Sequence, residues 1–267
     1  MLISHALLVP HLATLLVDEH RHHRTEMLEA LARASERLRA EAPEAVVAVS
    51  VRWAAGAPFQ VDANKRHRTI TDYTGFGVEV RYDCAGHPAL ARALIEAGQR
   101  AGVRVAAAEH GVDSGISVPM HFLIPSRAVP VVPLSVAPRA VEECRAWGRV
   151  VRNVLAAWPA RAAFVVGGGL SNNEHAWNLK REVPEAREFD EIALDSLRRG
   201  EWDQLGERLG PLFDKALPEA QLRHLDLLRG FLSSDVRGEV LGYESSHGVG
   251  AALVEFPVTQ PVEAQKP

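Results

Sequence analysis

Short, continuous apolar runs alternate along this chain with longer segments whose apolar residues recur every three or four positions. A short apolar run rich in valine is typical of a buried strand, and the wider spacing is typical of an amphipathic helix. We therefore predict strands at residues 2–9, 46–51, 59–62, 78–82, 103–107, 129–134, 162–166, 240–243 and 251–256. Helices are predicted at residues 24–42, 88–101, 141–158, 185–200, 202–209 and 221–232. Prolines in the 129–134 run favour an edge strand or a strand end there.

The alternation of strands and helices predicts one α/β domain over residues 1–257. We expect a central mixed, mostly parallel sheet with helices on both faces, followed by a disordered tail at residues 258–267. Sheets of this kind bind ligands at the carboxyl ends of their strands. Because His11, Arg52 and the loop of residues 167–172 each follow a predicted strand, we expect them to converge there.

Composition narrows the class of protein. Of the 267 residues, 47% are hydrophobic and 24% are charged, which predicts a packed globular core. The net charge of −4 gives no basic footprint for nucleic acid. No apolar stretch approaches the length of a membrane span, and the apolar start reads as a strand rather than a signal peptide. Cys84 and Cys144 are expected to be free thiols in a reducing compartment, so a cytoplasmic location is expected.

Five short segments carry residue types that bear chemistry, and each lies near a predicted strand or helix end. They are Val9-Pro10-His11, Ser50-Val51-Arg52-Trp53, Asp113-Ser114-Gly115, Gly169-Leu170-Ser171-Asn172, and Glu219 before the run Leu227-Leu228-Arg229-Gly230-Phe231-Leu232. These segments resemble the active-site motifs of class III extradiol ring-cleavage dioxygenases, the LigB-type superfamily that includes the protocatechuate 4,5-dioxygenase catalytic subunit. The resemblance spans residues 2 to about 256.

The resemblance implies Fe(II) held by two histidines and one glutamate, with open positions for a catechol and for dioxygen. His11 matches the first ligand position, and His5 competes for it. Glu219 matches the glutamate, and His224 is an alternative ligand one turn later.

Three other family positions carry different residues here. Arg52 stands at the second histidine ligand, Ser114 at an active-site histidine, and Asn172 at the catalytic histidine. A guanidinium has no lone pair for iron, although it can supply a positive charge or bind a carboxylate. Asn172 can donate hydrogen bonds to a substrate but cannot exchange protons near neutral pH. His110 and His175 are the available substitutes for the missing histidines.

Three functions remain open at this point. The first is a non-catalytic partner subunit of a two-subunit dioxygenase. The resemblance includes 2-aminophenol 1,6-dioxygenase, whose smaller subunit keeps the fold without the iron site. The second is an active Fe(II) dioxygenase with a rebuilt ligand set that includes His110, His175 or His224. The third is a protein that binds a small aromatic anion through Arg52 and Asn172. The first predicts a hetero-oligomer with a catalytic paralogue and no cofactor in this chain, and homodimers are also common on this fold.

Overall fold

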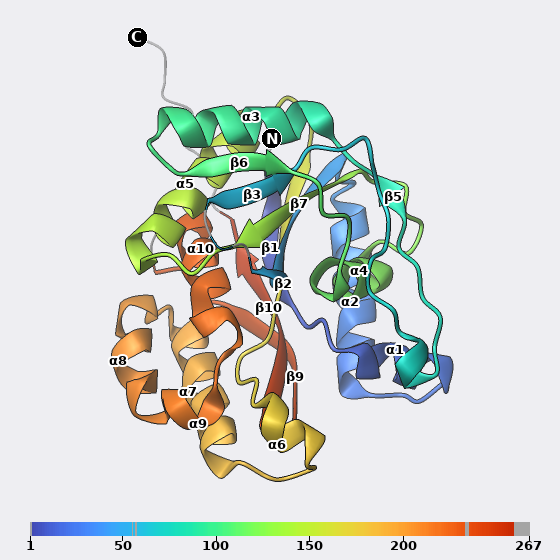
Figure 1. The fold of residues 1–267 in the computed structure, drawn as a ribbon, viewed down its shortest axis with the longest axis vertical. Helices are drawn as coiled ribbons and strands as arrows, with labels where there is room; N and C mark the ends of the chain where they lie inside the picture. Colours follow the sequence, from blue (N-terminus) through green and yellow to red (C-terminus); the bar gives the residue numbers. More distant parts are fainter. Residues whose placement is uncertain (1, 55, 57, 233–234, 259–267) are drawn as a thin grey trace.

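The structure is a computed structural model that describes residues 2–54, 56, 58–232 and 235–258. Within these residues, eight strands form one sheet in the order β6–β3–β7–β2–β8–β1–β10–β9 (Figure 1). They are β1 (Leu2–Val9), β2 (Ala45–Ala54), β3 (Phe59–Asp62), β6 (Val105–Ala108), β7 (Val131–Val136), β8 (Ala162–Gly167), β9 (Glu239–Ser246) and β10 (Val249–Pro257). A separate antiparallel pair is formed by β4 (Arg66–His67) and β5 (Cys84–Ala85).

Helices surround the large sheet. The α-helices are α1 (Ala13–His20), α2 (Glu26–Ala40), α3 (Pro88–Arg100), α4 (Ser114–Leu123), α5 (Val141–Ala157), α6 (Glu174–Asn178), α7 (Pro184–Arg199), α8 (Leu205–Leu209), α9 (Phe213–Ala216) and α10 (Arg223–Leu232). Single 3-10 turns lie at η1 (Thr74–Phe76), η2 (Trp202–Gln204), η3 (Gly210–Leu212) and η4 (Glu219–Leu222).

The pairing confirms the predicted mixed, mostly parallel sheet. Strands β7, β2, β8 and β1 run parallel to one another in the middle of the sheet, and β3 pairs parallel with β6. Antiparallel pairs join β1 to β10, β10 to β9 and β3 to β7. The carboxyl ends of β2, β8 and β1 therefore lie side by side at one edge of the sheet.

Side chains of the central strands alternate between two cores, as period-two geometry requires. In β1, Ala6 and Leu8 face the core that is covered by α3, α5, α7 and α10, whereas Leu7 and Val9 face the core under α1, α2 and α4. Figure 1 shows the two groups of helices on opposite sides of the sheet. The predicted single α/β domain with helices on both faces is confirmed.

Several local predictions are wrong or fall outside the described chain. Residues 78–82 form no strand with any described neighbour, and β7 lies between β3 and β2 rather than at an edge. Helices α1, α4, α6 and α9 were not predicted. The predicted tail falls outside the described residues from position 259, while Val258 is buried and its N–H donates to the carbonyl of Ser4. No helix in the described ranges is long and apolar enough to cross a membrane.

The glycines after β8 allow the backbone to approach its neighbours closely. A Cβ on Gly167 would lie 1.7 Å from the carbonyl oxygen of Gly115, and one on Gly168 would lie 2.7 Å from the ring of His224. Pro119, four residues after Gly115 in α4, has no N–H to donate to that carbonyl, so the backbone of Gly167 can pack against it. The glycine run therefore serves close packing at the end of the strand.

Candidate functional site

A cavity of about 340 Å³ lies at the carboxyl ends of β1, β2 and β8. His11 reaches it from the segment after β1, Arg52 from the end of β2, and Asn172 from the loop after β8. Ser114, the first residue of α4, also lines it. The structure thus brings together four residues that the sequence placed at matching family positions.

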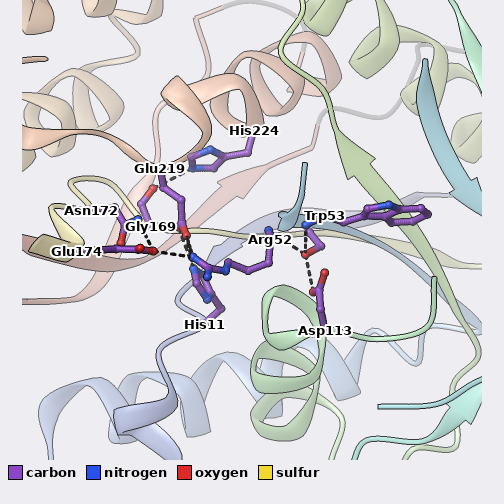
Figure 2. A network of polar contacts seen from close by, with 10 residues as sticks. His11, Arg52, Trp53, Asp113, Gly169, Asn172, Glu174, Glu219 and His224 are labelled. Carbon is purple, nitrogen blue, oxygen red and sulfur yellow. Dashed lines mark hydrogen bonds and ion pairs between the residues drawn. The ribbon is translucent and has the colours of Figure 1, made fainter. Parts of the chain in front are cut away.

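Glu219 contacts His11, which lines the cavity, and the two side chains face each other (Figure 2). The Nε2 atom of His11 lies 2.9 Å and 2.8 Å from the two carboxylate oxygens of Glu219. The backbone N–H of Gly169 donates to the same carboxylate at 2.8 Å. Both side chains are buried, so the pair is shielded from water and its interactions are strong.

Unusual backbone geometry places Glu219 at this position. Leu217, Ala220, Gln221 and Leu222 all have positive φ, a region that residues other than glycine rarely adopt. Burial alone would raise the pKa of Glu219, but the positive charge and hydrogen bond of His11 outweigh it and lower the pKa to about 2. Glu219 is therefore an anion at neutral pH, presented by a strained segment of the kind that clusters at functional sites.

A bulge in β2 presents Arg52 to the cavity. The pairing of β2 with β7 breaks its register between Ser50 and Ala54, which leaves Arg52 exposed and Trp53 buried. The hydroxyl of Ser50 accepts hydrogen bonds from the backbone N–H groups of Arg52 and Trp53. That hydroxyl in turn donates to Asp113 at 2.6 Å, so the loop before α4 holds the bulge in place.

The guanidinium of Arg52 extends toward both acidic side chains of the site (Figure 2). Its Nη1 atom lies 3.2 Å from Oε1 of Glu174 and 3.7 Å from Oε1 of Glu219. Burial tends to lower the pKa of Arg52, but the two carboxylates raise it above its ordinary value. Arg52 therefore stays positively charged beside Glu219.

Glu174, on the short helix α6, completes the polar rim of the cavity. Its carboxylate accepts one hydrogen bond from Arg52 and a longer one, of 3.4 Å, from the side chain of Asn172. Asn172 is held mainly through its backbone, whose N–H donates to the carbonyl of Ala216. The Asn172 amide is thus presented to the cavity as a hydrogen-bonding group.

The other four histidines proposed from the sequence lie outside the cavity. His5 is buried near Glu41 and Glu255, and His175 is exposed and lines a separate hollow beside α7. His110 stacks on Trp53 with ring centroids 4.1 Å apart, and its Nε2 lies 2.8 Å from Asp113. His224 is fully buried, and its Nε2–H donates to the carbonyl of Gly169. Burial lowers the pKa of His224 to about 4, so this ring is neutral and supports the glycine loop.

Sequence reasoning missed three contributors to the site, namely Ser50, Asp113 and Glu174. Ser50 and Asp113 belong to the same sequence motifs as Arg52 and Ser114, so those motifs could have pointed to them. Glu174 has a weaker indication in the sequence. It lies in the first turn of α6, after the capping residue Asn173, and acidic residues are common in that position of any helix. Its pairing with Arg52 joins positions that are 122 residues apart.

Within the part of the chain that the structure describes, no group of three or more His, Cys, Asp or Glu side chains is placed to hold a metal ion. The cavity instead combines the guanidinium of Arg52, two amides and the carboxylate of Glu174 with three aromatic side chains, Tyr73, Phe76 and Trp177. Such a set suits a small polar aromatic molecule.

Comparison with known proteins identifies a family and a similar fold. The family described as "Catalytic LigB subunit of aromatic ring-opening dioxygenase" matches residues 5–254. No curated protein matches the sequence. The fold is similar to that of the uncharacterized protein JW3007 from Escherichia coli K12, with a TM-score of 0.71 over 94% of this chain and 99% of that chain, at 18% sequence identity. Because the match covers nearly the whole chain, this protein belongs to the LigB family of aromatic ring-opening dioxygenase subunits.

Proposed function

We propose that this chain does not cleave aromatic rings with Fe(II) by itself and is the non-catalytic partner subunit of a two-subunit, catechol- or 2-aminophenol-type dioxygenase. The observation that carries the proposal is the guanidinium of Arg52, 3.7 Å from Glu219 and beside His11. The family typically uses Fe(II), whose site needs two histidines and one glutamate. His11 and Glu219 supply two of these donors, and Arg52 stands where the second histidine is expected.

The donor set does not fit the iron site for two physical reasons. First, Arg52 offers no lone pair, so the chain supplies one imidazole fewer than the family set. Second, its fixed positive charge already partners Glu219, and a divalent cation bound to Glu219 would be repelled by it. The residues that remain bind and orient a small molecule instead, through the Arg52 guanidinium and the Asn172 amide.

Iron content is the test of this proposal. After anaerobic loading with Fe(II) and desalting, we expect far less than one iron per chain, and no oxygen uptake with catechol or 2-aminophenol. Co-expression with a paralogue that has both histidines is expected to give a stable hetero-oligomer by light scattering. Near one iron per chain, with oxygen uptake, would instead establish a rebuilt ligand set.

The aromatic lining favours a second candidate function, the binding of a small aromatic anion. Tyr73, Phe76 and Trp177 line the cavity that also holds the charged end of Arg52. A flat ring with a carboxylate matches both features, because aromatic side chains stack on rings and a guanidinium pairs with carboxylates.

Ligand-dependent stabilisation checks this second candidate. At a benzoate concentration 100 times the Kd, binding to the native state adds about 2.7 kcal/mol, which raises the Tm by several degrees. Arg52→Gln is expected to abolish the shift, since it removes the cation and leaves a shorter, uncharged polar side chain. Binding of benzoate that is equally tight in Arg52→Gln would exclude Arg52 as the anion site.

A further inference from the structure

Only one nitrogen of the Arg52 guanidinium contacts the acidic side chains. Its contacts with Glu174 and Glu219 are both made through Nη1. None of the hydrogen bonds among the described residues involves its Nε or Nη2. A carboxylate binds a guanidinium best through two parallel N–H donors, so a ligand that pairs with Nη1 and Nη2 needs the Nη1 that Glu174 holds.

The two carboxylates near Arg52 differ in how firmly they are held. Glu219 is 5% exposed and is fixed by His11 and by the N–H of Gly169. The side chain of Glu174 is 62% exposed, and besides Arg52 the one described hydrogen-bond donor to its carboxylate is the Asn172 amide, at 3.4 Å. Exposed ion pairs are weak because water competes for both charges. Glu174 is therefore the carboxylate that a ligand can displace from Arg52.

The place that Glu174 would vacate lies next to the aromatic side of the cavity. Trp177, one turn after Glu174 on α6, and Phe76 both line the same hollow. Phe76 is 49% exposed, which leaves apolar surface to be covered by a ligand. A ring against these side chains occupies the same cavity as the Arg52 guanidinium and the Asn172 amide.

We infer that Glu174 is an internal counter-ion that occupies the carboxylate position on Arg52, and that a small aromatic carboxylate displaces it on binding. The inference rests on the second proposed function, the binding of aromatic anions. It adds a residue that controls the affinity of the cavity for them. Glu174 lowers the affinity for every carboxylate because the ligand must first break the pair with Arg52. It has no such effect on neutral rings, which do not compete for the guanidinium.

Calorimetric titration of the full chain with benzoate and with benzamide tests the inference. Glu174→Gln is expected to bind benzoate about 1.5–5 times more tightly than the unmodified chain does, since removing one exposed ion pair changes an equilibrium by roughly that factor. Benzamide affinity is expected to stay unchanged. Glu188→Gln is the matched control, because Glu188 is exposed on α7 and makes no described ion pair. It is expected to leave both affinities unchanged.

The remaining outcomes separate the inference from the function on which it rests. If benzoate binds through Arg52 and Glu174→Gln leaves its affinity unchanged or weaker, Glu174 is not a displaced counter-ion, and anion binding stands. If neither the unmodified chain nor Glu174→Gln binds benzoate while benzamide still binds, the pocket takes neutral rings and both ideas fail. If no ring compound binds at all, both fail as well.

Discussion

Arg52→His is expected to give a chain that retains Fe(II) after desalting, with an affinity at least about 100 times that of the unmodified chain. The substitution adds the missing imidazole beside two groups that already converge, the Nε2 of His11 and the carboxylate of Glu219, 2.8 Å apart at their closest. It also removes the positive charge 3.7 Å from that carboxylate. Loss of an outer-shell partner alone changes metal affinity about 10–100-fold, so gain of a direct ligand should exceed that range.

Arg52→Gln is the matched control for this gain. It removes the same charge at the same β2 bulge without offering an imidazole, so it separates relief of repulsion from ligation. Anaerobic titration against a chelator of known affinity, followed by metal analysis, measures both variants. Equal iron retention by Arg52→His and Arg52→Gln would mean that His11 and Glu219 are not two-thirds of a metal site. A strong gain in Arg52→His alone would support the view that this chain lost iron at that one position.

The central sheet was predictable because its strands are buried on both faces. Residues 162–166 are all apolar and residues 46–51 are apolar except for Ser50, and such runs indicate a parallel strand in the middle of a sheet. Parallel neighbours necessarily end at the same edge, so the meeting of His11, Arg52 and Asn172 followed from the order of strands and loops. The family motifs then supplied Glu219, which no periodic pattern would have placed.

Elements without a distinctive pattern were missed for physical reasons. Residues 78–82 alternate correctly, with Val78 and Tyr82 buried and Glu79 and Arg81 outside, yet no described strand lies beside them to pair with. Alternation reports which side of a segment is buried and not whether its backbone has a partner. Helix α4 contains Pro119, a residue that normally argues against a helix interior.

The electrostatic partners at the site were the hardest part to predict. The pair of Arg52 with Glu174 and the pair of Ser50 with Asp113 join residues 122 and 63 positions apart. Their contact depends on the bulge in β2 and on the start of α4, neither of which has a sequence signature. Sequence alone therefore located the cavity and its cation, and the structure was needed to show which acids face that cation.

Asp190 is expected to make the stability of the protein fall as the pH rises from about 4 to about 6. Burial raises the pKa of this carboxyl from 3.8 to about 6, although Ser171 and Tyr243 donate hydrogen bonds to it. Between those pH values the native state keeps a proton that the unfolded state has lost, so raising the pH favours unfolding. Below pH 4 both states are protonated, and above pH 6 both are ionised.

The full effect is at most about 3 kcal/mol, since one unit of pKa difference corresponds to about 1.4 kcal/mol. Asp190→Asn removes the titration while keeping a planar, hydrogen-bonding side chain against the segment that carries Asn172. Urea unfolding at several pH values is expected to show Asp190→Asn gaining up to about 3 kcal/mol relative to the unmodified chain between pH 4 and pH 7. Asp214→Asn, at an exposed position on α9, serves as the control and should show no such trend. A constant difference between Asp190→Asn and the unmodified chain across this range would mean that the buried carboxyl keeps its ordinary pKa, and that its hydrogen bonds balance the cost of burial.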